Sequence, residues 1–161
     1  MSTVYIGIGS NLGDRRGNCE KAMELLEKTG IIVKKRSSVY ETEAWGVRDQ
    51  PPYINMAVEI ETELSPTQLL TALKAMEKEA GREKSSRWGP RVLDLDILLF
   101  EDVTVLDDDL KIPHPLMHER EFVLIPLDEI APEANHPLLR KSVHELLQQL
   151  MRRTTGSHGV S

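Results

Sequence analysis

The chain contains apolar runs of two kinds, which predict strands and helices in a regular order. Runs rich in β-branched residues predict four strands, over residues 4–8, 31–40 and 53–63 and in the run that ends at Phe100. Apolar residues at helical spacing predict one helix over residues 18–28 and a second from Ser65-Pro66 to Gly81. This order of elements predicts an α+β fold with a ferredoxin-like βαββαβ core.

Smaller elements are predicted after Phe100. The pattern predicts a turn at residues 107–109, a short helix at 116–120 and a final helix at 142–152, whereas residues 122–127 fit either a strand or a helix. We expect these C-terminal helices and short strands to extend the core, with a tendency to three α/β/α layers. No linker divides the chain, so we expect one domain over residues 1–153 and a disordered tail over 154–161.

Composition narrows the classes of function. The chain has 161 residues and a formal net charge of −6, which argues against binding nucleic acid or anionic membranes through bulk charge. Its first residues lack the positive segment of a signal peptide, and no apolar run approaches the roughly 20 residues of a membrane helix. Cys19 is the single cysteine, so no intrachain disulfide can form. We expect a cytoplasmic monomer without nucleic-acid or membrane partners.

Two aspartates interrupt the last apolar run. Asp94 and Asp96 are two residues apart in a predicted strand, so both side chains lie on one face, about 7 Å apart along the backbone. Two carboxylates on one face of an apolar strand repel each other unless a cation lies between them. A hard divalent cation that also binds substrate phosphates meets this need. The alternatives are an exposed strand face, or neutralisation by Arg87 and Arg91.

Positive and aromatic side chains precede these aspartates. Arg82, Lys84, Arg87 and Arg91 place four positive charges within ten positions, and Trp88 lies among them. Guanidinium groups and an aromatic face are what a nucleoside triphosphate needs beside a metal ion. A solvated charged surface is the alternative.

The glycines near the N-terminus do not form a dinucleotide-binding motif. Gly7, Gly9 and Gly13 lie between a predicted strand and a predicted helix, but the third glycine comes four residues after the second, where the motif requires three. We predict a tight turn around Asn11 instead. The chain also lacks a P-loop sequence.

Two histidines near residue 115 raise the question of a zinc site. His114 and His118 have the i, i+4 spacing of a zinc-binding helix, but no glutamate lies between them and Pro115 disturbs the geometry. We predict instead that His114 donates to a phosphate, because Arg120 is close in the sequence.

Tyr53 and Asn55 share one face of a predicted strand. A side-chain amide donates and accepts in one plane, which suits the edge of a flat nitrogen heterocycle. Phe122 would supply a second aromatic wall. The alternative is that Tyr53 is a core aromatic and Asn55 a capping residue.

Five motifs follow one another along the chain. They are Gly9-Ser10-Asn11-Leu12, Gln50-Pro51-Pro52-Tyr53-Ile54-Asn55, Arg87-Trp88-Gly89-Pro90-Arg91, Leu93-Asp94-Leu95-Asp96, and Pro113-His114-Pro115 followed by Arg120 and Phe122. In this order they resemble the hydroxymethyldihydropterin pyrophosphokinases, folate-pathway enzymes that transfer pyrophosphate from ATP to a pterin. The resemblance extends from Val4 to about Pro132.

The resemblance implies a catalytic domain with two substrates, ATP and 6-hydroxymethyl-7,8-dihydropterin. It implies that Asp94 and Asp96 hold two Mg²⁺ ions that bridge the triphosphate, and that Arg82 and Arg91 act with them in catalysis. The implied pterin site contains Thr42, Trp45, Gly46, Tyr53, Asn55 and Phe122. The implied ATP site contains Glu77, Lys84, Trp88, Arg91, Ile97, His114 and Arg120.

The chain departs from the pattern of this family in three places, one of which is the loop from Arg82 to Trp88, about one residue short. Glu43-Ala44-Trp45 stands where a Pro-rich segment is frequent, and Lys84 stands where an arginine is common, which keeps the charge but loses the bidentate fork. A catalytically silent nucleotide-binding module with the same fold is an alternative function. An RNA-recognition domain is a further alternative, opposed by the net charge and by the lack of an aromatic-rich strand.

Overall fold

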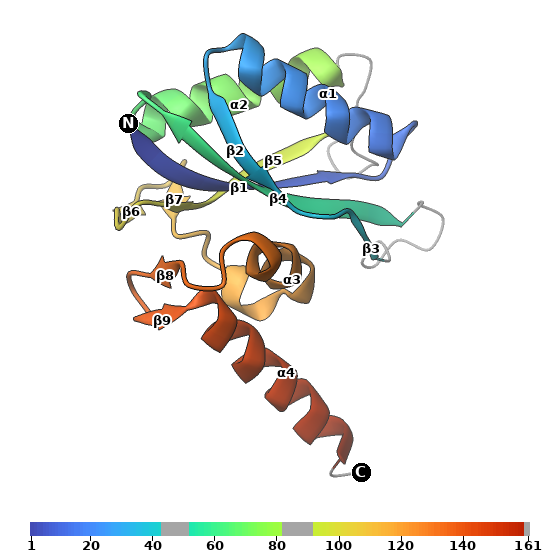
Figure 1. The fold of residues 1–161 in the computed structure, drawn as a ribbon, viewed down its shortest axis with the longest axis vertical. Helices are drawn as coiled ribbons and strands as arrows, with labels where there is room; N and C mark the ends of the chain where they lie inside the picture. The colour runs from blue at the N-terminus through green and yellow to red at the C-terminus, as the bar shows by residue number, and fades with distance from the viewer. Residues whose placement is uncertain (43–51, 82–91, 160–161) are drawn as a thin grey trace.

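The computed structural model of this chain describes residues 1–42, 52–81 and 92–159. Its centre is a five-stranded antiparallel sheet in the order β2-β4-β1-β5, with β3 also paired to β4 (Figure 1). The strands are β1 (Ser2–Ser10), β2 (Ile32–Arg36), β3 (Tyr40–Thr42), β4 (Tyr53–Thr62) and β5 (Asp94–Phe100). This strand order, with one helix after β1 and one after β4, confirms the predicted ferredoxin-like core.

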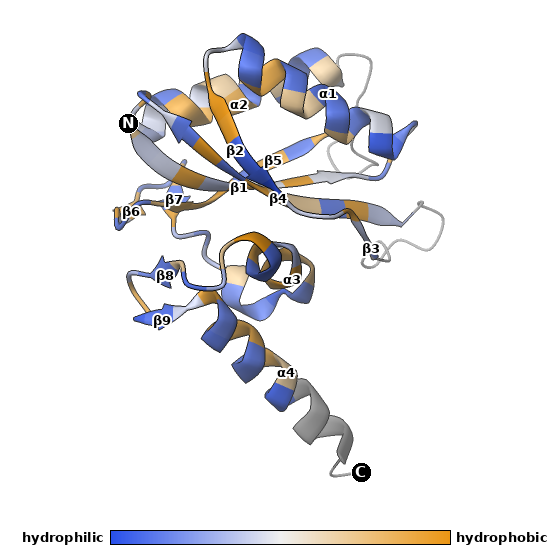
Figure 2. Ribbon diagram, viewed as in Figure 1, coloured by the Kyte–Doolittle hydropathy of each residue, from blue (hydrophilic) through white to orange (hydrophobic). Residues whose placement is uncertain are grey.

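Helices cover both faces of the sheet. α1 (Arg15–Lys28) and α2 (Pro66–Ala80) lie on one face, α3 (Glu121–Ile130) lies on the other, and α4 (Val143–Gly159) packs against α3 (Figure 1). Each face has its own apolar cluster, and hydrophobic residues follow the strands and the side of α3 toward the sheet (Figure 2). The three-layer expectation is therefore confirmed.

The alternation of β4 determines which of its residues can form a site. Ile54 and Met56 are buried in the cluster beneath α1 and α2, so Tyr53 and Asn55 point to the opposite face, where Ala57 belongs to the α3 cluster. The predicted sharing of one face by Tyr53 and Asn55 is confirmed.

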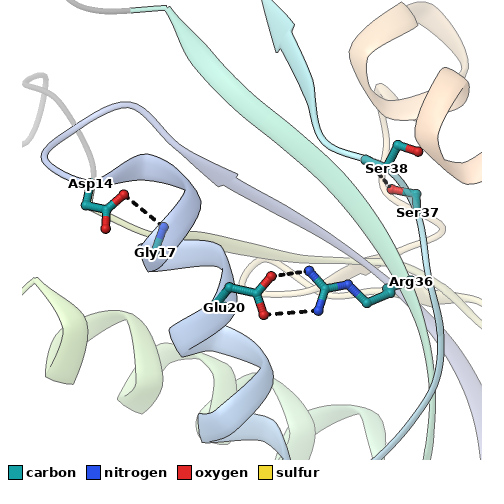
Figure 3. Close-up of polar contacts among 6 residues, drawn as sticks. All are labelled: Asp14, Gly17, Glu20, Arg36, Ser37 and Ser38. Carbon is teal, nitrogen blue, oxygen red and sulfur yellow. Dashed lines mark hydrogen bonds and ion pairs between the residues drawn. The ribbon is translucent and has the colours of Figure 1, made fainter.

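Capping side chains set the starts of the first two helices. α1 begins at Arg15, three residues before the predicted start, because Asp14 is its N-cap and accepts a hydrogen bond from the Gly17 amide at 3.1 Å (Figure 3). A Cβ on Gly17 would lie 2.2 Å from Asp14 Oδ2, so glycine allows this close approach. Ser65 caps α2 as predicted, in a capping box with Gln68.

The strand predicted over residues 31–40 is divided into two. β2 shifts register against β4 between Val33 and Lys35 and ends at Arg36, and pairing with β4 resumes at Tyr40. Between these strands, the Ala57 amide donates to Ser37 Oγ at 2.9 Å. The result is a separate short strand, β3, next to Tyr53 and Asn55.

The C-terminal third forms small elements around α3. β6 (Val105–Leu106) pairs with β7 (Lys111–Ile112), the 3₁₀ helix η1 (Met117–Glu119) precedes α3, and β8 (Asn135–His136) pairs with β9 (Lys141–Ser142). Residues 122–127, which fitted either element, are helical. α4 continues to Gly159, so the predicted helix end at residue 152 is wrong, and residues 154–159 of the expected tail belong to this helix. None of the helices in the described ranges is long and apolar enough to cross a membrane.

Candidate functional site

Four residues form a row across the sheet on the face toward α3. Asp94 of β5 pairs with Gly9 of β1, Gly9 pairs with Asn55 of β4, and Asn55 pairs with Tyr40 of β3. Directly paired residues in a sheet point to the same face. The row therefore brings the predicted metal ligand Asp94 and the predicted pterin residue Asn55 to one surface, with a glycine between them.

Glycines on β1 lie beside both aspartates. Gly7 pairs with Asp96 as Gly9 pairs with Asp94, and Asp96 is exposed whereas Asp94 is half-buried. A Cβ on Gly9 would lie 3.3 Å from Asn55 Oδ1 and 3.7 Å from Tyr53 Cδ1. The absence of a side chain at Gly9 thus leaves room for Asn55 and Tyr53 next to the aspartates.

Glu77 of α2 adjoins the same strand from its outer edge. Its Oε2 accepts a hydrogen bond from the Leu95 amide at 2.7 Å, and β5 is the edge strand of the sheet at this point. Burial raises the pKa of Glu77, the Leu95 amide and Lys74 oppose this, and the charges of Asp94 and Asp96 raise the pKa further. The predicted ATP residue Glu77 therefore lies close to both aspartates.

His114 approaches the aspartates from the segment after β7. Its amide donates to the Leu98 carbonyl at 3.0 Å, and its Nδ1 accepts from the Leu116 amide at 3.2 Å. A neutral ring therefore carries its proton on Nε2. Burial lowers the pKa of His114, Asp96 opposes this shift and Arg120 adds to it, so both residues are near the ring.

His118 contacts a different ring from the second half of the chain. The His118 ring packs edge-on against the His136 ring, with the ring centroids 6.3 Å apart. The role predicted for His114 remains a prediction.

Arg120 and Phe122 lie together at the start of α3. Arg120 is the N-cap of α3, and its guanidinium carbon is 5.6 Å from the centre of the Phe122 ring. α3 covers the face of the sheet that carries Asn55. This places a cation and an aromatic ring from α3 on the same side of the sheet as the row.

The remaining predicted residues are divided between three places. Thr42 ends β3 and pairs with Tyr53. Ile97 is 5 % exposed and belongs to the cluster beneath α1 and α2, on the face of β5 opposite to the aspartates. Six predicted residues lie outside the described ranges: Trp45, Gly46, Arg82, Lys84, Trp88 and Arg91.

The sequence analysis missed the residue that holds the turn after β1. Asn18 Nδ2 donates to Ser10 Oγ at 3.1 Å and to the Leu12 carbonyl at 2.8 Å. An asparagine among the polar residues at the start of a helix was the available signal, but it does not indicate which backbone groups it binds. Asn18 thus holds the Gly9-Ser10-Asn11-Leu12 turn in place.

The donor set fits a magnesium ion that is completed by phosphate oxygens. Mg²⁺ is commonly held by one or two carboxylates together with substrate phosphates and water. Asp94 and Asp96 supply two carboxylates on one face of β5. No group of three or more His, Cys, Asp or Glu side chains that could hold a metal occurs among the described residues. The described residues therefore do not form a metal site in which protein side chains supply all the ligands.

Comparison with known proteins identifies the family of this chain. Residues 5–132 match the family described as 7,8-dihydro-6-hydroxymethylpterin-pyrophosphokinase (HPPK). Two proteins named 2-amino-4-hydroxy-6-hydroxymethyldihydropteridine pyrophosphokinase are similar: one from Aquifex aeolicus is 44% identical over 145 residues, covering 90% of both chains, and one from Bacillus subtilis is 48% identical over 131 residues, covering 81% of this chain and 78% of its own.

The fold is also found in larger solved proteins. The crystal structure of Plasmodium falciparum HPPK-DHPS wild type with pteroate has a TM-score of 0.80 and 16% identity, covering 98% of this chain. This chain spans 44% of that chain's length. The sequence matches decide the classification: the chain belongs to the 7,8-dihydro-6-hydroxymethylpterin-pyrophosphokinase family.

Proposed function

We propose that this protein transfers the terminal pyrophosphate of ATP to the hydroxymethyl group of 6-hydroxymethyl-7,8-dihydropterin and releases AMP, as a step of folate biosynthesis. The observation that carries the proposal is the row from Asp94 through Gly9 to Asn55, on one face of the sheet. It places carboxylates suited to a metal–triphosphate next to an amide suited to a pterin edge. Family membership supports the same activity.

In the proposed pterin site, Asn55 hydrogen-bonds the edge of the ring and Tyr53 contacts its face, with Phe122 on the other face. Thr42, Trp45 and Gly46 would border the ring. Tyr53 and Asn55 point to one face of β4, and Phe122 lies in the first turn of α3, the helix that covers this face. This arrangement supports a flat aromatic ligand between the sheet and α3.

In the proposed ATP site, His114 donates its Nε2 proton to a phosphate oxygen and Arg120 neutralises phosphate charge. Glu77, Lys84 and Trp88 would complete this site, whereas the buried side chain of Ile97 lies on the other face of β5. Arg82 and Arg91 would neutralise charge that develops during transfer. The Leu116 amide on His114 Nδ1 supports this role, because it leaves the proton on Nε2.

Asp94 and Asp96 would hold two Mg²⁺ ions, which supply charge neutralisation and alignment of the triphosphate when bound. The hydroxymethyl oxygen attacks the β-phosphorus, and the bond from this phosphorus to the oxygen bridging the α- and β-phosphates breaks. The electron pair leaves on AMP, and the hydroxyl proton passes to solvent or to an aspartate oxygen. The protein's own contribution is to hold the two substrates in line.

We further propose that residues 1–153 act as one catalytic domain, as a monomer in the cytoplasm. The cytoplasm is a reducing compartment, and the presence of a single, buried cysteine, Cys19, supports this location. The sheet and both apolar clusters draw on residues from β1 to α4, which supports a single unit.

The test is chromatography of adenine nucleotides after incubation with Mg²⁺ and ATP, with and without 6-hydroxymethyl-7,8-dihydropterin. AMP formed only in the presence of the pterin is the expected result. ADP would show ordinary phosphoryl transfer and contradict the proposal. ATP binding without any product would favour the catalytically silent binding module.

A further inference from the structure

β3 is a short strand whose position matters for the pterin half of the site. Its three residues pair with the three residues of β4 that include Tyr53 and Asn55: Thr42 with Tyr53, Glu41 with Ile54 and Tyr40 with Asn55. A strand of three residues forms few backbone hydrogen bonds, so contacts beyond the ladder must fix its place. The structure supplies such contacts on both faces of the sheet.

On the α3 face, Glu129 binds the segment that leads into β3. The Ser38 amide donates to both carboxylate oxygens at 3.1 Å, Ser38 Oγ donates to Oε2 at 3.0 Å, and the Tyr40 hydroxyl donates to Oε1. One carboxylate of α3 thus receives hydrogen bonds from the residues directly before β3 and from its first side chain.

On the α1 face, Arg15 joins β3 to the start of β4. Its Nη1 donates to Glu41 Oε2 at 2.9 Å and to the Pro52 carbonyl at 2.7 Å. Glu41 is the central residue of β3, and Pro52 directly precedes β4. The Arg15 side chain is 27% exposed and the Glu41 side chain is 57% exposed, so the more buried contact of Arg15 is the one to the Pro52 carbonyl.

Tyr40 and Glu41 point to opposite faces of the sheet, so one helix on each side holds the same strand. We propose that Arg15 and Glu129 are positioning residues for the pterin substrate: they fix β3 against β4 and thereby place Tyr53 and Asn55. This inference rests on the proposed function.

The expected effect is selective for one substrate. Arg15→Ala and Glu129→Ala should each raise the KM for the pterin roughly tenfold, because misplacement of a binding group by about 1 Å can cost a hundredfold. The KM for ATP and the kcat at saturating pterin should change less than about threefold, since Asp94, Asp96 and Glu77 lie on β5 and α2. Arg15→Lys keeps the charge and should recover part of the pterin affinity.

A matched control lies on the same face of the sheet. Arg36 at the end of β2 forms an ion pair with Glu20 of α1 (Figure 3). Glu20→Gln removes an arginine–carboxylate contact between α1 and a strand, as Arg15→Ala does, but it does not touch β3. We expect Glu20→Gln to leave both KM values unchanged.

Two results would overturn the inference. One is an equal rise of both KM values in Arg15→Ala and Glu129→Ala. The other is the same pterin effect in Glu20→Gln, because a general loss of stability would then explain it.

Hydrogen exchange of residues 40–42 and 53–55 in the substrate-free protein separates this inference from the proposed function. Exchange should be roughly tenfold faster in Arg15→Ala and Glu129→Ala than in the unmodified protein or Glu20→Gln. An unmodified protein that forms no AMP would overturn the proposed function, whereas unchanged exchange would overturn the positioning role.

Discussion

The carboxylate of Glu77 accepts a hydrogen bond from the amide of Leu95, the residue between the two aspartates, at 2.7 Å. Leu95 lies on the edge strand, and within the described ranges no further strand pairs with β5 on its outer side. Glu77 therefore connects α2 to the strand that presents Asp94 and Asp96.

The first prediction concerns this hydrogen bond. Glu77→Ala should lower the free energy of unfolding by about 1–3 kcal/mol, because it removes the partner of a partly buried amide. Glu77→Gln keeps an acceptor oxygen and should cost less. Urea unfolding measures both. Lys74→Ala serves as control, because Lys74 contacts Glu77 at 3.8 Å with a 66% exposed side chain, and should change stability little.

The second prediction concerns the aspartates. Asp94→Asn and Asp96→Asn should each reduce Mg²⁺-dependent formation of AMP about a hundredfold or more, because the ligand charge is lost while side-chain size is kept. Circular dichroism and the unfolding midpoint should stay near those of the unmodified protein. Asp102→Asn, at the exposed turn after β5, is the control with normal turnover. An unfolded Asp94→Asn protein would indicate a structural role instead.

The third prediction concerns the missing side chain at Gly9 of β1, next to Asn55. Gly9→Ala adds a methyl group 3.3 Å from Asn55 Oδ1, so Asn55 must move by a few tenths of an ångström. The KM for the pterin should rise several-fold in Gly9→Ala, since the hydrogen-bonding edge shifts. Gly7→Ala meets only ordinary contact with Leu98 at 3.5 Å. Its KM for the pterin should rise less, and the reverse order would contradict the placement of Asn55.

The fourth prediction concerns pH and Cys19. Burial raises the pKa of the Cys19 thiol from its ordinary value of 9.0 to about 11. The thiolate fraction near pH 8 should therefore be about 100-fold below that of a free thiol, and native protein should react slowly with Ellman's reagent.

The same pKa shift predicts a change in alkaline stability. Because the folded pKa is raised, the associated stability is present below pH 9 and is lost as pH rises through about 11. Cys19→Ala should flatten the fall of unfolding free energy over this window. A wild-type slope that equals the variant's would contradict the shift. Tyr5, whose pKa is also raised to about 12, continues to titrate in both proteins.

Residue periodicity was sufficient to predict the core of the fold. The alternation of β4 correctly placed Tyr53 and Asn55 on one face, and the Ser65-Pro66 start of α2 was confirmed. The division of this segment into β2 and β3 was not predictable, because a register shift in a β-branched run leaves the sequence pattern of a strand intact.

Contacts between segments that are distant in the sequence could not be predicted from residue periodicity. The proximity of His114 to Asp96 depends on the path from β5 through β7, and the packing of His118 against His136 depends on the β8–β9 hairpin. Family motifs named His114 as a site residue, but only the fold shows that its Nδ1 is occupied by the Leu116 amide.

The row from Asp94 to Asn55 has a geometric consequence. Neighbouring strands in a sheet are about 4.8 Å apart, so these two backbones are separated by roughly 10 Å, with β1 between them. This separation is set by backbone hydrogen bonding and does not change when side chains are exchanged. Exchanges of side chains around the proposed pterin site can therefore change its shape while the backbone separation between Asp94 and Asn55 stays constant.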